Sequence, residues 1–254
     1  MHASSLTEKR FSRHFDTYEQ QAVVQRSMAF ELVQNTASVC ENQPLHILEI
    51  GCGTGLVTKE LIRTCSIAHY CGNDIVAESQ IRNRSLLKEI PNSDFSFITG
   101  DASHITQLPF VPNVIISGAC FQWMRDLVSF ITNLHSFLPV GGILAFSSFG
   151  PENYTEIRQI SGFGLEYHTL GALKNMLSGQ FEVLIANEKL TKLTFSNPTD
   201  VLRHIREMGV NGLSPVRWTK KELLSFTDSY IRLFASAEGL PLTYHPIQII
   251  AKKL

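Results

Sequence analysis

Apolar residues in the first half of the chain fall in short runs that alternate with helical patterns. The run 45–50 (Leu-His-Ile-Leu-Glu-Ile) predicts a buried strand, and the apolar positions of 56–62 recur at helical spacing. Strands that alternate with helices are typical of a parallel, doubly wound α/β sheet. Further strands are predicted at 69–75, 95–102, 113–117 and 143–147, with a helix over 126–138.

Helical patterns also flank this core. Near the N-terminus, Val24, Met28 and Leu32 recur at helical spacing. A sixth strand is expected within 181–195, and two helices separate it from a last strand within 244–254. We therefore predict one domain, made of an N-terminal helical cap (1–43), a core (44–195), a helical lid (196–240) and a last core strand (241–254).

Capping signatures mark where the two lid helices begin. Thr199 and Asp200 are expected to cap the first helix, and Thr219 with Glu222 forms a capping box for the second. Because the two helices are inserted between the last two strands, they should lie near the carboxyl ends of the parallel strands. Such sheets bind their ligands at that edge.

A glycine turn, Gly51-Cys52-Gly53-Thr54-Gly55, joins the strand 45–50 to the helix 56–62. Glycine lets backbone approach a ligand closely, and the helix that follows offers free amide groups. A phosphate-binding loop would need Gly-Lys-Ser/Thr after the turn, and a dinucleotide fingerprint would need wider glycine spacing. Glu49 would repel a pyrophosphate, but it suits a ligand that carries an amino group and a sulfonium.

This pattern resembles the first motif of the class I S-adenosylmethionine-dependent methyltransferases. An ordinary βα turn would show the glycines alone, whereas Asp74 ends the next strand where such sheets place a carboxylate on ribose hydroxyls. The resemblance implies a Rossmann-like α/β fold, with a seven-stranded, mostly parallel sheet and helices on both faces, and it places Asp101 by the adenine amino group. S-adenosylmethionine is then the expected methyl donor. The residues expected to bind it are Glu49, Gly51, Cys52, Gly53, Thr54, Gly55, Asp74, Asp101, Ala102 and Phe121.

Blocks outside the glycine turn and its two aspartates carry a closer resemblance. Residues 11–26, 121–124, 149–157 and 164–167 are similar to the malonyl-acyl-carrier-protein O-methyltransferases of biotin synthesis, and the match extends over nearly the whole chain. The resemblance implies methyl transfer to the free carboxylate of a malonyl thioester carried on acyl-carrier protein. The methyl ester would then prime pimeloyl and biotin synthesis.

Methyl transfer to a carboxylate does not depend on acid or base catalysis by the protein's side chains. A carboxylate with a pKa near 4 is already anionic, so no general base is required, and alignment in a dry pocket provides the rate. Tyr18 and Arg203 are expected as the catalytic residues that hold this carboxylate. Family members often place aspartate after this tyrosine, where the chain has Glu19, and this weakens any role for the acid. The further candidates for substrate binding are Tyr167, His168, Arg206 and Trp123.

A local basic rim is expected around the site, because acyl-carrier proteins are acidic and the chain as a whole has a formal net charge of −1. Two groups of cations could form it, one near the N-terminus and one in the lid. They are Lys9, Arg10, Arg13 and Arg26, and Arg203, Arg206, Arg217, Lys220 and Lys221. Scattered surface cations are the alternative interpretation.

Several classes of function are disfavoured. The five cysteines form no C-x-x-C pair, so we expect no metal and reduced thiols, as in a cytoplasmic protein. No apolar run approaches the roughly 20 residues of a membrane helix, and no Asn/Asp-Pro-Pro-Tyr loop indicates nucleic acid as substrate. Two alternatives stay open: a methyltransferase of a free small acid such as aconitate, and a non-catalytic protein that binds S-adenosylmethionine.

Overall fold

A central seven-stranded sheet carries the fold of the computed structural model, which describes residues 18–19, 21–40, 43–88, 94–208 and 219–254. Its strands are β1 (Leu45–Ile50), β2 (Ile67–Asp74), β3 (Asp94–Thr99), β4 (Val114–Ser117), β5 (Ile143–Phe149), β6 (Phe181–Glu188) and β9 (Pro246–Lys253). They lie in the order β3-β2-β1-β4-β5-β9-β6. The strands β1 to β5 pair in parallel, and β9 is antiparallel to both of its neighbours. The predicted seven-stranded, mostly parallel sheet is confirmed.

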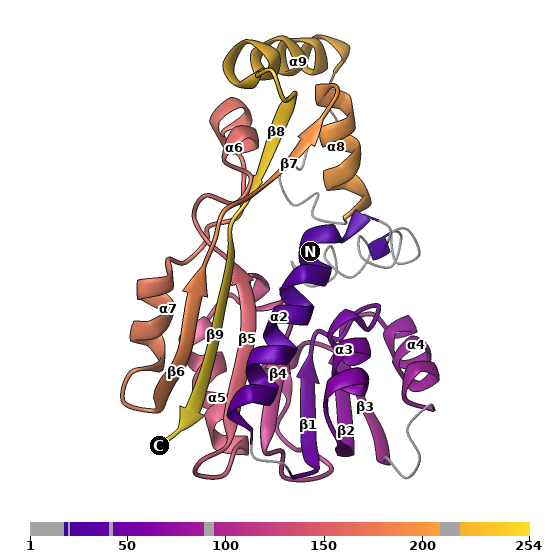
Figure 1. Cartoon of the computed structure of the whole chain (residues 1–254), viewed down its shortest axis with the longest axis vertical. Coiled ribbons are helices and arrows are strands. Elements are labelled where there is room, and N and C mark those ends of the chain that lie inside the picture. Colours follow the sequence, from indigo (N-terminus) through magenta and orange to yellow (C-terminus); the bar gives the residue numbers. More distant parts are fainter. Residues whose placement is uncertain (1–17, 20, 41–42, 89–93, 209–218) are drawn as a thin grey trace.

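Helices cover both faces of this sheet (Figure 1). Successive residues of a strand point to opposite faces, and Ile47 and Leu48 of β1, both fully buried, belong to different apolar clusters. Ile47 packs in the cluster with α2 (Val23–Val39), α3 (Leu56–Thr64) and α4 (Glu78–Leu87). Leu48 packs with α5 (Leu127–Phe137) and α7 (Leu170–Leu177). This two-sided burial explains why β1 is almost continuously apolar.

A second, two-stranded sheet lies outside the core. It pairs β7 (Thr191–Phe195) with β8 (Leu240–Tyr244) and carries α6 (Thr155–Ser161), α8 (Pro198–Glu207) and α9 (Lys220–Phe234) around it. The lid boundaries expected from the sequence, 196 and 240, fall where β7 ends and β8 begins, at one end of this two-stranded ribbon. The strands β7 and β8, which those boundaries assigned to the core, therefore belong to the lid.

The helix caps agree with the sequence in one lid helix and correct it in the other. Thr219 and Glu222 form the predicted capping box at the start of α9. The cap of α8 is Asn197 in place of Thr199 and Asp200, and its side chain accepts a 2.9 Å hydrogen bond from the Asp200 amide. Pro198 explains the shift, because proline fits the first helical position, where no amide hydrogen is needed.

The helix α2 joins the core to the lid. Leu32 and Val33, in its second half, pack on the sheet, whereas Val24 and Met28, in its first half, pack among lid residues. The N-terminal segment thus lies where sheet, lid and cavity meet. No helix among the described residues has the length and apolar character needed to cross a membrane.

Candidate active site

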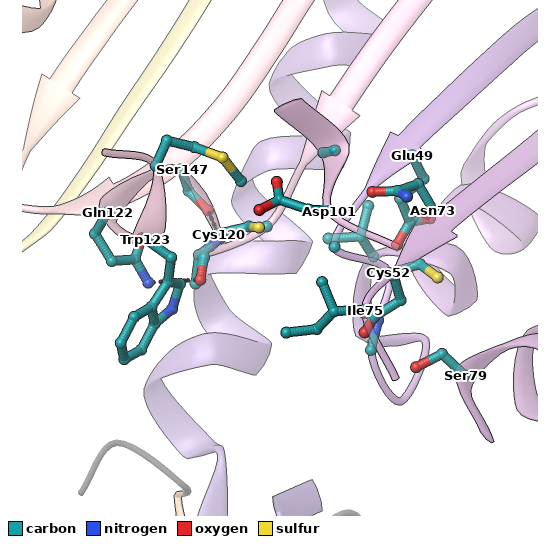
Figure 2. A pocket seen from close by; sticks show the side chains of 18 of the residues that line it. Glu49, Cys52, Asn73, Ile75, Ser79, Asp101, Cys120, Gln122, Trp123 and Ser147 are labelled. Carbon is teal, nitrogen blue, oxygen red and sulfur yellow. Dashed lines mark hydrogen bonds between the residues drawn. The ribbon is translucent and has the colours of Figure 1, made fainter. Parts of the chain in front are cut away.

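A cavity of about 860 Å³ opens at the carboxyl ends of β1, β2 and β4. The strands β2 and β3 lie on one side of β1, and the chain then crosses to β4 on the other side. The cavity is therefore at the switch point where doubly wound sheets bind ligands. Loops that follow the first four strands line it, together with Tyr18, Gln25, Met28 and Ala29 of the N-terminal segment. In Figure 2, Cys120, Gln122, Trp123 and Ser147 stand on one side of this space, and Glu49, Cys52, Asn73 and Ile75 stand on the other.

Residues 51–54 of the predicted glycine turn line the cavity, whereas Gly55, which was also expected to bind the donor, does not. Gly51, Gly53 and Gly55 have φ angles of +66°, +49° and +86°, which L side chains rarely adopt. A Cβ on Gly51 would lie 2.5 Å from Sγ of Cys120, so backbone and neighbouring loop are in close contact. No side chain caps α3, which begins after Gly55, so its first amide groups have no side-chain acceptor.

Glu49 lies beside this turn in a buried polar cluster. Its side chain is 1% exposed, and Oε2 accepts hydrogen bonds of 2.9 Å from Tyr70 Oη and Thr58 Oγ1. Burial raises the pKa of Glu49 to about 8, which outweighs those hydrogen bonds, and the charge of Asp74 adds to the rise. Because Glu49 lines the cavity, a bound cation would stabilise its carboxylate form.

Asp74, the last residue of β2, ties two loops together. Its Oδ2 accepts a 2.7 Å hydrogen bond from the Gly53 amide, and its Oδ1 accepts a 2.8 Å bond from the Val76 amide. Burial raises the pKa of Asp74, although these amides favour the charged form.

Asp101 and Ala102 lie at the rim after β3. The strand ends at Thr99, earlier than expected, and Asp101 caps a short 3-10 helix, Ala102–His104. Its Oδ1 accepts hydrogen bonds from the amide and the hydroxyl of Ser103. Partial burial raises the pKa of Asp101, but these bonds outweigh burial and leave the pKa below its ordinary value. The acid is therefore ionised at neutral pH and can accept from an amino group.

Buried polar atoms without a partner test whether the cavity fits the expected donor. Gln25 Oε1 and Thr54 Oγ1 line the cavity, are buried, and have no hydrogen-bond partner among the described residues. Such atoms are costly unless a ligand or water satisfies them. Together with the acids Glu49, Asp74 and Asp101, they fit a ligand that has an ammonium group, ribose hydroxyls and a sulfonium.

Two aromatic residues after β4 were both expected near the ligand, and the structure separates them. Trp123 lines the cavity, as predicted. Phe121 does not: its ring is 1% exposed and stacks on Phe146, with ring centroids 4.3 Å apart. Phe121 thus supports the loop from the apolar core, because its ring points to the face of the sheet that α5 covers.

Tyr167 and His168 do not line the cavity either. Tyr167 is partly buried, and its hydroxyl accepts a 3.0 Å hydrogen bond from Asn153 Nδ2. The neighbouring Leu165 is the residue of this segment that reaches the cavity. His168 is exposed just before α7.

Arg203 and Arg206 lie on the solvent side of α8, which corrects the expectation that they face the substrate. Both are exposed, and Arg203 pairs with Asp200 at 2.7 Å. The buried side of this helix carries Val201, His204 and Ile205. Residues three apart do share a helix face, but polarity alone did not reveal that this face points away from the cavity.

The expected basic rim is only partly described. Lys9, Arg10, Arg13 and Arg217 lie outside the described residues. Lys220 and Lys221 are exposed at the start of α9, and Arg26 donates to the backbone carbonyl oxygen of Glu19. Arg125, which the sequence gave no reason to choose, is exposed and lines the cavity.

Sequence reasoning missed several further lining residues. Gln25 stands in the block 11–26, and Cys120 and Gln122 stand in or beside the block 121–124, so their positions were marked without a role. Ser147 lies within β5, where a buried strand residue gives no pattern that separates packing from ligand contact. The five cysteines are all free, and the described residues contain no cluster of three or more possible metal ligands.

Comparison with known proteins agrees with this geometry. Residues 48–144 match the family model described as "Methyltransferase domain". A malonyl-[acyl-carrier protein] O-methyltransferase of Chlorobium phaeovibrioides is 36% identical over 249 residues, which cover 98% of this chain and 96% of the relative. The enzyme of the same name from Bacteroides thetaiotaomicron is 34% identical over 259 residues, with 98% of each chain covered.

Solved structures support the fold. A protein of Bacillus halodurans described as a putative methyltransferase superposes with a TM-score of 0.62 at 13% identity, and the match covers 88% of this chain and 98% of that one. The N-methyltransferase NodS of Bradyrhizobium japonicum, solved with S-adenosyl-L-homocysteine, gives a TM-score of 0.56 at 12% identity, with 97% and 98% covered. The chain therefore belongs to the malonyl-[acyl-carrier protein] O-methyltransferase family, whose methyl donor is S-adenosylmethionine.

Proposed function

We propose that this protein transfers the methyl group of S-adenosylmethionine to the free carboxylate of a malonyl thioester on acyl-carrier protein, and that the ester primes pimeloyl and biotin synthesis. The observation that supports the acceptor is the extent of the similarity, which covers 98% of the chain. The matched region includes the cap and the lid as well as the core. The cap lines the cavity through Tyr18, Gln25, Met28 and Ala29, and we propose that the cap and the lid together select the acceptor.

The donor, when bound, supplies an electrophilic methyl group on a positively charged sulfur. Three acids would hold it: Glu49 near the glycine turn, Asp74 toward the ribose and Asp101 toward the adenine. Ile75 and Val76 offer apolar surface beside them. The cavity is thus acidic where the donor is cationic, and the acceptor supplies the remaining negative charge.

Tyr18 is the residue we assign to the acceptor carboxylate. It lines the cavity from the cap side, and burial, together with the charge of Asp74, raises the pKa of its hydroxyl. The phenol therefore stays protonated at neutral pH and acts as a hydrogen-bond donor. A neutral donor can orient a carboxylate without neutralising it, which preserves the nucleophilicity that displacement needs.

Side chains across the cavity are fixed by their own hydrogen bonds. Gln122 donates to the carbonyl oxygen of Ala119 at 2.6 Å and accepts from Ser148 at 3.3 Å. Ser147 accepts a 3.1 Å bond from the Ala119 amide. This wall is preorganised, so the acceptor would enter a site whose shape changes little.

The carrier protein would approach from the lid side. Acyl-carrier proteins are acidic, and Arg206, Lys220 and Lys221 are exposed on the lid, with Arg125 at the cavity. Their contribution would be to encounter and orientation, because exposed charges act mainly on the association rate.

A labelling experiment tests this proposal. The protein is incubated with methyl-labelled donor and with malonyl-, succinyl- or acetyl-loaded carrier protein, and base-labile label is measured. We expect strong labelling of the malonyl carrier and none of the acetyl carrier, which has no free carboxylate. Absence of label from the malonyl sample would refute the proposal.

Further acceptors separate the alternatives. Malonyl-coenzyme A shares the thioester but lacks the carrier surface, and free malonate and aconitate lack both. Faster labelling of a free acid than of the malonyl carrier would favour a small-molecule methyltransferase. Tight donor binding without labelling of any acceptor would favour a non-catalytic protein.

A further inference from the structure

Four described residues near the N-terminus, Tyr18, Gln25, Met28 and Ala29, line the donor cavity. Tyr18 lines the cavity, and its carbonyl oxygen accepts a 2.9 Å hydrogen bond from the Ala22 amide. Three residues later than Tyr18, Gln21 contacts His204 of α8, with Gln21 Oε1 and His204 Nδ1 3.3 Å apart. We call residues 18, 19 and 21–26 the strap. A ligand packed against Tyr18 would lose that contact whenever the strap moves away.

Glu19, next to Tyr18, joins the strap to the core. One carboxylate oxygen, Oε1, accepts from Lys59 Nζ at 2.9 Å and from Arg82 Nη2 at 3.1 Å. Arg26 donates to the backbone carbonyl oxygen of the same residue. Burial of Glu19 raises its pKa, but the hydrogen bonds and charges of Lys59 and Arg82 outweigh burial and lower it.

The two cations belong to the two helices that follow the donor-binding loops. Lys59 lies in α3, which begins after the glycine turn, and Arg82 lies in α4, which follows the loop after Asp74. Through one carboxylate oxygen, Glu19 therefore contacts both helices that follow the donor-binding loops. The three side chains are 25% (Glu19), 34% (Lys59) and 47% (Arg82) exposed, so salt can screen the contact.

We propose that Glu19 is a positioning residue that latches the strap, and with it Tyr18, over the bound donor and so sets the rate at which the donor and its demethylated product leave. A group that holds a lid acts on ligand release without touching the reacting atoms. Such a latch must be weak enough to open in every turnover. Partly exposed ion pairs are of that strength.

The proposal rests on donor binding and not on the choice of acceptor, so its test uses S-adenosyl-L-homocysteine and no acceptor. Glu19→Gln keeps the shape of the side chain and removes its charge. We expect the dissociation rate constant of S-adenosyl-L-homocysteine, measured by stopped-flow competition, to rise about fivefold to tenfold, because two partly exposed ion pairs are lost. The thermal midpoint of the ligand-free variant should change little.

A matched control lies on the same helix. Glu60 of α3 pairs with Arg63 at 3.3 Å, three residues away, and forms no hydrogen bond or ion pair with the described residues of the strap. Glu60→Gln should leave the dissociation rate constant unchanged. An equal rise in both variants would overturn the proposal, because it would indicate a general effect of charge on α3.

The salt dependence of the dissociation rate constant and a double-mutant cycle distinguish a latch role of Glu19 from a purely structural role. High salt should raise the dissociation rate constant of the wild type toward that of Glu19→Gln and should hardly affect the variant. Lys59→Met should weaken retention in the wild type but add little in the Glu19→Gln background. Additive effects, or a wild-type rate that salt does not change, would overturn the proposal.

In turnover, the same variants should raise the KM for S-adenosylmethionine. Loss of kcat with an unchanged dissociation rate constant would show that Glu19 acts on the chemical step and would refute the latch. Arg82→Met gives a second, independent way to remove one ion pair, so the test does not depend on one variant being folded.

Discussion

The amide of Gly53 donates a 2.7 Å hydrogen bond to Oδ2 of Asp74, and this bond joins the loop after β1 to the loop after β2. The other oxygen of Asp74 accepts the Val76 amide. Hydrogen bonds from backbone amides to a carboxylate are stronger than those between neutral groups. The two donor-binding loops are therefore held together before a ligand arrives, and less free energy is spent on ordering them during binding.

Asp74→Asn should weaken donor binding more than it changes the fold. The amide can accept only one of the two bonds, so a buried N–H group faces another donor, which costs about 1–3 kcal/mol. We expect the Kd of S-adenosyl-L-homocysteine, measured by calorimetry, to rise at least tenfold. Asp94→Asn is the control, since Asp94 is 81% exposed on the adjacent strand and pairs only with His69 among the described residues. Equal affinities of both variants would contradict the prediction.

Gly51→Ala should be more harmful than a glycine substitution of similar backbone geometry elsewhere. Gly51 has φ +66° and Gly162 has φ +69°, but a Cβ on Gly51 meets Cys120 Sγ at 2.5 Å, whereas Gly162 has nothing within 4 Å. Gly162→Ala should therefore lower the free energy of unfolding by about 1 kcal/mol, the left-handed penalty alone. Gly51→Ala should add steric strain and lose donor binding, and urea unfolding with calorimetry measures both. Equal unfolding energies would contradict a role for the Cys120 contact.

The cluster around Glu49 contains more hydrogen-bonding contacts than hydrogens if Glu49 is ionised. Thr58 Oγ1 lies 2.9 Å from Glu49 Oε2, 3.0 Å from Tyr70 Oη and 2.6 Å from Asn83 Oδ1. Tyr70 Oη also lies 2.9 Å from Glu49 Oε2. The two hydroxyls supply two hydrogens for four contacts, and a proton on Glu49 supplies a third. The geometry therefore agrees with a Glu49 pKa raised to about 8.

The raised pKa of Glu49 predicts a pH dependence with a definite sign. Between pH 4.5, the ordinary pKa of a glutamate side chain, and about pH 8, the folded ligand-free protein holds a proton on Glu49 that the unfolded chain has released. The stabilisation from this group is complete below about pH 4.5 and is lost as pH rises through 8, with a slope of up to about 1.4 kcal/mol per pH unit. Glu49→Gln should flatten the dependence of the unfolding free energy on pH between 5 and 8. An unchanged slope in the variant would contradict the assignment.

Donor binding should release the proton that Glu49 holds in the ligand-free protein. A bound cation favours ionised Glu49, so binding releases a proton below about pH 8 and tightens as the pH rises toward that value. Calorimetry of donor binding in two buffers with different ionisation enthalpies measures the release, and Glu49→Gln should abolish it.

The sequence predicted the donor half of the site because backbone geometry leaves a local trace there. Glycine is needed at positions 51, 53 and 55 because the backbone there has positive φ angles, and Asp74 is the last residue of β2. Each of these features lies within one element or at its end. The order of the strands then brings these loops together at the cavity, although Phe121, predicted with them, does not line it.

The acceptor half could not be predicted in the same way, because it depends on how separate segments pack. Arg203 was expected to face the substrate, but α8 turns it toward solvent and buries His204 against Tyr244, with His204 Nε2 and Tyr244 Oη 2.7 Å apart. Glu19 gave no local signal, since its partners Lys59 and Arg82 are 40 and 63 residues away. Which face of a lid helix points inward is decided by the ribbon that carries it.

Tyr18→Phe tests the acceptor assignment most directly. The change removes one hydroxyl from a residue that lines the cavity and whose pKa is raised by burial, so the loss is that of a hydrogen-bond donor and not of a base. We expect kcat with malonyl carrier protein to fall about tenfold or more, because an acceptor carboxylate that lacks this bond is less well aligned for displacement. The Kd of S-adenosyl-L-homocysteine should change less than twofold.

Arg203→Met is the comparison, since Arg203 is exposed and paired with Asp200. This variant should leave kcat unchanged and at most raise the KM for the carrier at low salt. A pH–rate profile that keeps its shape in Tyr18→Phe would agree with a neutral donor. Unchanged turnover in Tyr18→Phe, or a loss of kcat in Arg203→Met, would reverse the assignment of the two residues.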